Sequence, residues 1–301
     1  MNIKRRRLVS IFPLILLLFI CTPVRTVHSH SIKNYSDLIP VKVTILPCMD
    51  PVTTYKKFHT MAHYLEKQIN RKIVLQVPRD YSAFIRIIKR QKTDFSFQPA
   101  HIYLTFEDYF NKGTILSSLT PAGKRQHHAI LITRTDSSIE KIEDLRGKSV
   151  LFGPKQSTVK TFAARQLLQQ HGIDVETDLH DSSFGSSCEK TAFNVYLKAY
   201  DAGFICDHGY NTLMGEENPD WPIPPGSLKI IAQTIPIPTW IFSASRNVDP
   251  STAKSVNEAL LSLTRSVDTE HQKVLHSIDS GGFVPTDERD LLTLREQFAA
   301  P

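Results

Sequence analysis

The stretch Val150-Leu151-Phe152-Gly153-Pro154-Lys155-Gln156-Ser157-Thr158 has the pattern of an apolar strand, a Gly-Pro turn and the start of a helix. The first turn of such a helix has unpaired N–H groups and the positive end of the helix dipole, and both attract an anion. The hydroxyls of Ser157 and Thr158 can donate as well, and Lys155 can add a full positive charge. The GxxxxGK[ST] spacing of a nucleotide-binding P-loop is absent. The stretch therefore predicts either an anion-binding helix start or an ordinary capped helix.

The alternation of strand and helix continues on both sides of this stretch. Short apolar runs predict strands near residues 41–46, 73–77, 95–98, 129–133, 148–152 and 202–206, and helical spacing of apolar residues predicts helices over 55–69, 81–88, 157–171 and 189–199. Strands that alternate with helices in this way form βαβ units and mostly parallel sheets. We therefore expect an α/β protein of two lobes, with two mostly parallel sheets flanked by helices. A ligand would bind between the lobes, at the carboxyl ends of strands.

Composition and charge are typical of an exported globular protein. Hydrophobic residues make up 41% of the 301 residues and charged residues 22%, which is enough for one or two cores. Residues 1–29 contain five basic residues and no acid, an uncharged run of about 14 residues that is short for a membrane span, and a possible cleavage point after Ser29. This pattern predicts a secretory signal peptide; an uncleaved anchor or a lipid on Cys21 is the alternative. The remaining residues carry 31 bases against 30 acids, so the net charge of +6 does not indicate a nucleic-acid partner.

Two further segments place polar side chains next to predicted helices or strands. Ser186 and Ser187 precede the helix predicted over 189–199, so their hydroxyls either contact an anion or cap that helix. Asp207 directly follows the apolar strand 202–206 and is expected at the cleft. There its carboxylate would accept a hydrogen bond from a protonated ligand oxygen or from an ammonium group, unless Asp207 is a solvated turn residue.

Histidines and cysteines follow no metal-binding spacing. His127 and His128 are adjacent on a predicted strand and therefore point to opposite faces, and His101 stands apart from them. There is no CxxC or HExxH motif. Three cysteines follow the expected cleavage point: Cys48, Cys188 and Cys206. An odd number allows at most one internal disulfide, so these residues are apolar fillers, one disulfide plus one thiol, or a soft-metal or redox site.

Several short motifs occur in order between about residues 41 and 295: Tyr64-Leu65-Glu66-Lys67, Asp80-Tyr81-Ser82-Ala83, Asp144-Leu145-Arg146-Gly147-Lys148, Ser157-Thr158, Ala202-Gly203 with Asp207, and Gly282-Phe283-Val284-Pro285. In this order they resemble the phosphate/phosphite/phosphonate-binding proteins of ABC importers. The resemblance implies a two-lobed, type II-like periplasmic-binding-protein fold with a two-segment hinge. It also implies that Ser157 and Thr158 hold the oxyanion, that Ser186, Ser187 and Asp207 add contacts, and that Tyr55 closes over the ligand. One departure from the family is that Ser187 or Cys188 stands near the place of its usual histidine.

Taken together, these observations predict a first lobe of residues 41–133 plus 235–301 and a second lobe of residues 134–234, with hinge crossings near Thr133 and Pro236. We expect a monomeric extracytoplasmic binding protein, not an enzyme, that binds a small phosphorus oxyanion without metal or cofactor and delivers it to an inner-membrane ABC permease. A sensing protein that presents its closed form to a membrane kinase is an alternative. A periplasmic thiol, redox or soft-metal protein that uses the cysteines is another.

Overall fold

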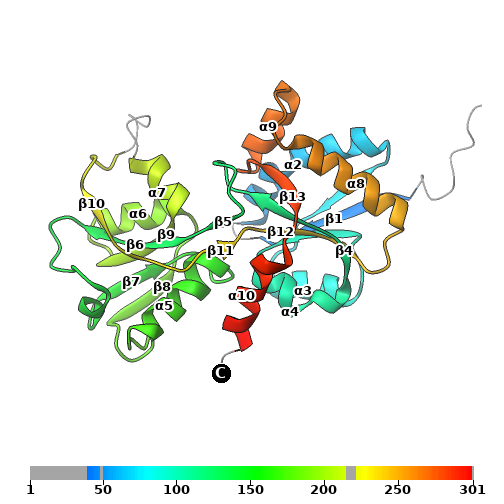
Figure 1. The fold of residues 1–301 in the computed structure, drawn as a ribbon. Helices are drawn as coiled ribbons and strands as arrows, with labels where there is room; N and C mark the ends of the chain where they lie inside the picture. Colours follow the sequence, from blue (N-terminus) through cyan, green and yellow to red (C-terminus); the bar gives the residue numbers. More distant parts are fainter. Residues whose placement is uncertain (1–38, 48–49, 215–221, 300–301) are drawn as a thin grey trace, which may run out of the picture.

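Two lobes lie side by side in the computed structural model, which describes residues 39–47, 50–214 and 222–299 (Figure 1). One lobe is built on a six-stranded sheet and the other on a five-stranded sheet. A two-stranded ribbon, β5 (Gln126–His127) paired with β11 (Ile237–Pro238), lies between them. The two-lobed α/β fold predicted from the sequence is therefore confirmed. The expected signal peptide lies outside the described residues, and no helix within them is long and apolar enough to cross a membrane.

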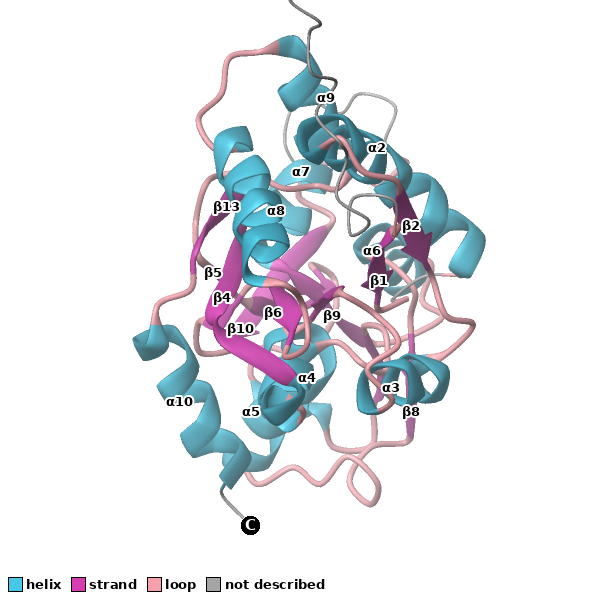
Figure 2. Ribbon diagram, turned by 90° about the vertical axis from the view of Figure 1, so that its right-hand side faces the viewer, coloured by secondary structure: helices cyan, strands magenta, loops and turns pink. Residues whose placement is uncertain are grey.

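The first lobe has helices on both faces of its sheet, whose strand order is β13-β4-β12-β3-β1-β2. Its strands are β1 (Val41–Ile45), β2 (Ile73–Gln76), β3 (Phe95–Gln98), β4 (Phe110–Leu119), β12 (Ile241–Ser245) and β13 (Gly282–Pro285). Its helices are α2 (Pro51–Ile69), α3 (Tyr81–Lys89), α4 (Ala100–Thr105), η1 (Glu107–Tyr109), α8 (Pro250–Leu263), α9 (Thr269–Ser277) and α10 (Glu288–Ala299). Helices α2, α8 and α9 cover one face and α3 and α4 the other (Figures 1 and 2).

The second lobe has the strand order β10-β6-β9-β7-β8. Its strands are β6 (Ala129–Arg134), β7 (Ser149–Phe152), β8 (Asp181–Phe184), β9 (Ala202–Cys206) and β10 (Leu228–Gln233). Its helices are η2 (Ile142–Leu145), the π-helical turn η3 (Thr158–Ala163), α5 (Ala164–Gln170), α6 (Cys188–Tyr196) and α7 (Asp207–Met214). The helix predicted from residue 157 onward thus begins as expected, but its first turns are π-helical rather than α-helical.

Both sheets are mixed, which corrects the expectation of mostly parallel pairing. Strand β1 pairs parallel with β2 and β3, and β7 pairs parallel with β8 and β9. Strand β12 is antiparallel to β3 and β4, β13 to β4, and β6 to β9 and β10. Parallel neighbours need a long crossover connection. The chain crosses between the lobes twice, from β4 through β5 into β6 and from β10 through β11 into β12. The two crossings run in opposite directions, because β5 and β11 pair antiparallel, and β4 and β12, like β6 and β10, are therefore antiparallel as well.

The position of the first crossing follows from the same pairing. Strand β6 pairs with β9 and β10, so residues 129–133 form part of the second sheet rather than the first. We therefore place the first crossing at β5, a few residues before the expected Thr133. The second crossing at β11 lies next to the expected Pro236.

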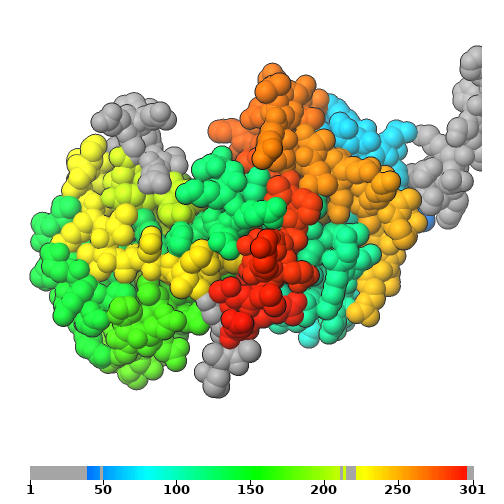
Figure 3. Space-filling model, in the orientation of Figure 1, coloured from blue at the N-terminus to red at the C-terminus, as the bar shows by residue number. Residues whose placement is uncertain are grey.

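Helix α10 packs at the junction of the two lobes. It contacts α4 and the ribbon strand β11, and Figure 3 shows it, in red, over the junction on the face in view. Arg295 of α10 donates two hydrogen bonds to the Glu107 carboxylate, at 2.7 Å and 2.5 Å. This pair of bonds holds α10 against the first lobe, because a guanidinium and a carboxylate match in geometry.

Candidate functional site

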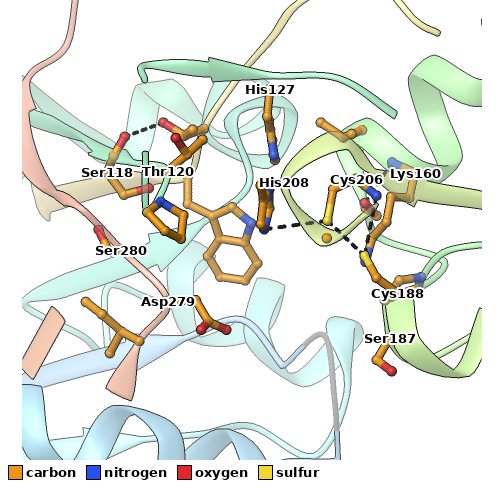
Figure 4. Close-up of a pocket in the computed structure, with 18 of the residues that line it drawn as sticks. Ser118, Thr120, His127, Lys160, Ser187, Cys188, Cys206, His208, Asp279 and Ser280 are labelled. Carbon is orange, nitrogen blue, oxygen red and sulfur yellow. Dashed lines mark hydrogen bonds between the residues drawn. The ribbon is translucent and has the colours of Figure 1, made fainter. Parts of the chain in front are cut away.

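A cavity of about 410 Å³ lies between the lobes, and residues of both lobes line it. From the second lobe it is lined by Pro154, Ser157, Val159, Lys160, Ser186, Ser187, Cys188, Glu189, Cys206, His208 and Gly209. From the first lobe and the ribbon it is lined by residues that include Thr54, Lys57, Phe58, Phe97, Ser118, Thr120, His127, Trp240, Asp279 and Ser280. Figure 4 shows Ser118, Thr120, Asp279 and Ser280 on one side, Lys160, Ser187, Cys188 and Cys206 on the other, and His127 and His208 between them.

The two residues of the predicted anion-binding helix start are separated by the structure. Ser157 lines the cavity, and its hydroxyl caps the helix by accepting a hydrogen bond from the Lys160 N–H at 3.0 Å. Thr158 is buried and is not among the lining residues. Its Oγ1 lies 2.6 Å from Nδ1 of His101, which belongs to α4 of the first lobe. The Thr158 hydroxyl therefore joins the two lobes instead of facing the cavity.

Lys160 brings a positive charge to the cavity, where the sequence had pointed to Lys155. Lys155 is exposed, and its ammonium lies over the ring of Phe184, 5.9 Å from the ring centroid. Lys160 lines the cavity, and its Nζ lies 3.6 Å from Sγ of Cys188. Its side chain passes over Gly153, where a Cβ atom would lie 2.4 Å from the Lys160 Cβ. The glycine of the Gly-Pro turn therefore makes room for the lysine, a role that its position in the sequence did not indicate.

The Gly-Ser-Ser loop lies in the cavity wall. Ser186 and Ser187 both line the cavity, Ser186 being exposed and Ser187 half-buried. The Ser187 hydroxyl also caps α6 by accepting from the Lys190 N–H at 3.2 Å. The two readings of this loop, capping and cavity lining, are thus compatible for Ser187.

Asp207 and Tyr55 are not among the lining residues. Asp207 begins α7, and its Oδ1 accepts a hydrogen bond from the His208 N–H at 2.8 Å. Partial burial would raise the pKa of this carboxyl, but the hydrogen bonds from His208 outweigh burial and lower the pKa to about 2. Tyr55 is 46% exposed on α2, and its ring lies beside His59 with centroids 5.6 Å apart. In this arrangement of the lobes, neither side chain faces the cavity.

The adjacent histidines point to different partners, as the strand pattern predicts. His128 Nδ1 lies 2.7 Å from the Thr234 carbonyl oxygen. His127 lines the cavity and stacks on His208 with centroids 6.1 Å apart, and its Nδ1 is a buried atom that has no hydrogen-bond partner among the described residues. Burial lowers the pKa of His127 to about 3, so its imidazole is neutral at pH 7. His127 therefore contributes an uncharged ring to the cavity wall.

His127, Asp207 and His208 form a donor set that the sequence did not indicate. One ligand atom from each residue lies within 4.8 Å of the others, close enough to hold a divalent cation after small side-chain movements. The set is assembled by the ribbon strand β5 and the start of α7, which are 80 residues apart in the chain. No spacing motif encodes such a set, because only the tertiary fold brings its parts together.

Two of the four cysteines, Cys188 and Cys206, meet in the cavity wall. Sγ of Cys188 lies 2.8 Å from Sγ of Cys206, and Nε2 of His208 lies 3.5 Å from Sγ of Cys206. The hydrogen bond between the two sulfurs lowers the pKa of Cys206 to about 7 and raises the pKa of Cys188, to which burial also contributes. Cys48 lies outside the described residues.

The first lobe contributes an apolar surface to the cavity that the sequence analysis missed. Phe97 of β3 and Trp240, just before β12, pack with ring centroids 5.0 Å apart, and Phe58 packs against Phe97 at 5.7 Å. Lys57 of α2 also lines the cavity, but its Nζ is paired with the Asp279 carboxylate at 2.6 Å. These residues come from four separate segments, so no local pattern marks them as neighbours.

Comparison with known proteins agrees with the two-lobed fold. The sequence pattern of the family described as "ABC transporter, phosphonate, periplasmic substrate-binding protein" matches residues 43–291. The binding-protein component of an ABC phosphonate transporter from Pseudomonas aeruginosa is 17% identical, with a TM-score of 0.70 over 86% of this chain and 85% of that one. A Prochlorococcus marinus protein in complex with methylphosphonate is 15% identical, with a TM-score of 0.71 over 85% and 96% of the two chains. A Xanthomonas citri protein bound to chloride ion is 18% identical, with a TM-score of 0.69 over 85% and 95%. At this level of identity the structures show a shared fold. The family match spans most of the sequence, and the chain therefore belongs to the periplasmic substrate-binding proteins of phosphonate ABC transporters.

Proposed function

We propose that this chain binds a small phosphonate in the cavity between its lobes, as an extracytoplasmic monomer, and delivers it to an ABC permease. The observation that carries the proposal is the two-sided chemistry of the cavity. Its second-lobe wall is lined by Ser157, Ser187 and Lys160, which carry two hydroxyls and an ammonium, whereas its first-lobe wall is lined by Phe97 and Trp240. A phosphonate has the same two sides, an anionic PO₃ group and an apolar substituent on phosphorus.

The polar wall supplies the anion-binding groups. Hydrogen bonds from hydroxyls and an ammonium to a phosphorus oxyanion are charge-assisted, and each contributes about 1.5–3 kcal/mol. A dissociation constant near 1 μM needs about 8 kcal/mol, which three such contacts approach before apolar burial is added. Within this proposal Ser157, Ser186 and Ser187 remain ligand contacts. Thr158, Tyr55 and Asp207 act at a distance from the ligand, Thr158 by joining the lobes.

The apolar wall predicts the order of binding affinities among the ligands. Each buried CH₂ or methyl group contributes about 0.8 kcal/mol, so a methyl substituent against Phe97 and Trp240 should favour methylphosphonate over phosphate by several-fold. The similar protein from Prochlorococcus marinus forms a complex with methylphosphonate. Because the contacts come from both lobes, the ligand stabilises the closed arrangement that the permease would receive.

Titration calorimetry with methylphosphonate, 2-aminoethylphosphonate, phosphite, phosphate and sulfate tests the proposal. We expect methylphosphonate to bind with a micromolar or lower dissociation constant, and sulfate to bind weakly because it lacks the apolar substituent. Absence of binding by every phosphorus oxyanion at millimolar concentration would contradict the function. Light scattering of the same samples tests whether the protein is monomeric.

A matched pair of lysine variants tests where the anion lies. Lys160→Met should weaken methylphosphonate binding by about 10- to 100-fold, the loss of one charge-assisted bond. Lys57→Met is the control, because Lys57 also lines the cavity but is already paired with Asp279 at 2.6 Å. We expect its dissociation constant to stay within about threefold of wild type. The reverse result would place the anion at the first-lobe wall and refute the assignment to the second lobe.

A further inference from the structure

Cys188 and Cys206 form a close pair of thiols in the wall of the cavity. Their Sγ atoms are 2.8 Å apart, and the Cys206 N–H also donates to Sγ of Cys188 at 3.4 Å. Both residues are buried by the protein, yet both line the cavity. Only 18 residues separate them in the chain, and each stands at the end of an element: Cys188 begins α6 and Cys206 ends β9. The pair is thus held in place by backbone that belongs to two packed elements.

The surrounding structure is shaped to admit both sulfurs. A Cβ atom at Gly209 would lie 2.9 Å from Sγ of Cys188 and 3.0 Å from Sγ of Cys206. Any residue other than glycine at position 209 would therefore clash sterically with the two sulfur atoms. Gly209 lies in α7, immediately after Asp207 and His208, so the third element of the wall also contributes to the space in which the sulfurs meet.

Two features favour a covalent link over a bound metal ion at the two sulfurs. Tetrahedral zinc holds two thiolates about 3.8 Å apart, while disulfide sulfurs lie about 2 Å apart, so the observed 2.8 Å is nearer to the disulfide. The ammonium of Lys160 lies 3.6 Å from Sγ of Cys188, where it would repel a cation. Disulfides persist in extracytoplasmic compartments, to which proteins of this family belong.

We propose that Cys188 and Cys206 are a covalent modification site that reacts with disulfides to form a reversible cystine in the cavity wall. One thiolate of the pair attacks a disulfide RSSR that enters the cavity, forming a mixed disulfide and releasing one RS⁻. The second thiolate attacks the protein sulfur of that mixed disulfide and releases the second RS⁻. The two protons lost by the cysteines are taken up by the two departing thiolates. The dithiol is oxidised by two electrons, and RSSR is reduced to two RSH.

The cystine bears on the ligand site because it ties two parts of the polar wall together. Cys188 directly follows Ser187, and His208 follows Cys206 by two residues. A link between them holds the Gly-Ser-Ser loop against the end of β9 before the ligand arrives, and pre-organised contacts bind more tightly because less freedom is lost on binding. This consequence, unlike the cystine itself, rests on the proposed function. We expect the oxidised protein to bind methylphosphonate about two- to tenfold more tightly than the reduced protein.

Peptide mapping tests the cystine directly in the purified exported protein. The protein is equilibrated with oxidised glutathione, alkylated with iodoacetamide, digested with trypsin without reduction, and analysed by mass spectrometry. Trypsin places Cys48 in the peptide 43–56, Cys188 in 166–190 and Cys206 in 199–229, so every pairing has a distinct mass. We expect the last two peptides to be joined, at a mass two hydrogens below their sum, and the midpoint of thermal unfolding to rise by several degrees.

Other outcomes of this mapping would overturn the proposal. In the peptide map, the proposal fails if both peptides are recovered alkylated, if either stays joined to glutathione, or if either is joined to the peptide of Cys48. It also fails if metal analysis of the untreated protein finds one zinc ion per chain and this zinc is lost in Cys188→Ser. The variants Cys188→Ser and Cys206→Ser test the exchange route, because at least one should trap a stable mixed disulfide with glutathione. If neither variant does, the two thiols do not react with small disulfides and the exchange route is refuted.

Calorimetry on the oxidised and reduced forms separates this proposal from the proposed function. Equal affinities of the two forms for methylphosphonate would refute the coupling to the ligand site. If neither form binds any phosphorus oxyanion, the proposed function fails, while the mass of the linked peptides still decides whether the cystine forms.

Discussion

Replacing Thr158 with valine removes one hydroxyl and keeps the shape of the side chain. In the structure this hydroxyl lies 2.6 Å from Nδ1 of His101, and the His101 ring stacks on Phe162 at a centroid distance of 5.8 Å. Burial lowers the pKa of His101 to about 4, so at pH 7 the bond joins two neutral groups. Such a bond contributes about 0.5–1.5 kcal/mol, and leaving a buried partner unsatisfied costs about 1–3 kcal/mol.

The bond couples the lobes, because His101 lies on α4 of the first lobe and Thr158 begins η3 of the second. A loss of about 1–3 kcal/mol in the joined arrangement should therefore appear in ligand binding, which favours that arrangement. Since 1.4 kcal/mol is a factor of ten, we expect Thr158→Val to weaken methylphosphonate binding by about 5- to 150-fold. Titration calorimetry measures this change directly. Small-angle scattering of the unliganded protein should show a larger radius of gyration in the variant.

Thr133→Val is the matched control. Thr133 is fully buried, and its hydroxyl donates to the Asp201 carbonyl at 2.7 Å within the second lobe, away from the cavity. We expect it to lower the free energy of unfolding by about 1–2 kcal/mol and to leave the dissociation constant unchanged. If Thr158→Val and Thr133→Val both lose stability while neither changes ligand affinity, the hydroxyl of Thr158 does not control lobe closure and the reasoning is refuted.

Two further perturbations, a lower pH and the substitution Gly209→Ala, should change the free energy of unfolding. The free energy of unfolding should fall as the pH is lowered from about 6.5 to about 4, by up to about 1.4 kcal/mol per pH unit for each buried histidine. Burial holds the pKa of His101 at about 4 and the pKa of His127 at about 3. In this pH range the unfolded chain therefore takes up protons that the folded chain does not. Urea unfolding at several pH values should show a shallower fall in His101→Gln, and an equally steep fall would rule out a contribution from His101. Gly209→Ala should lower the free energy of unfolding by about 1–3 kcal/mol, because the added Cβ would lie 2.9 Å from Sγ of Cys188. Gly113→Ala, whose nearest such contact is 3.6 Å, should change it by less than about 0.5 kcal/mol, and equal urea midpoints for the two variants would contradict this account.

Several features of the protein were predictable because they depend on residues close together in the chain. The strand at 150–152, its Gly-Pro turn and the helix start at Ser157 follow from short-range spacing and capping chemistry, and the structure has them as β7 and η3. The same holds for Ser187, which caps α6 and lines the cavity. The order of short motifs along the chain was sufficient for the family, because that order does not require knowledge of contacts.

The orientation of side chains and the order of strands depend on partners far away in the chain. Strand β4 (Phe110–Leu119) was not predicted, because its polar Ser117 and Ser118 are buried only by pairing with β12 and β13. Thr158 turns away from the cavity because His101, 57 residues earlier, accepts or donates a hydrogen bond there. The contact of His127 with His208 likewise exists only once the ribbon strand β5 lies against the start of α7.

The sequence alone thus determined the alternation of elements and the helix starts, since helix caps and turns are formed by residues within about four positions of one another. Only the tertiary structure decided which side chains share the cavity, which strands are antiparallel and that two cysteines meet in its wall. These contacts join segments separated by tens to hundreds of residues, and a periodic pattern in one segment carries no information about the partner that packs against it.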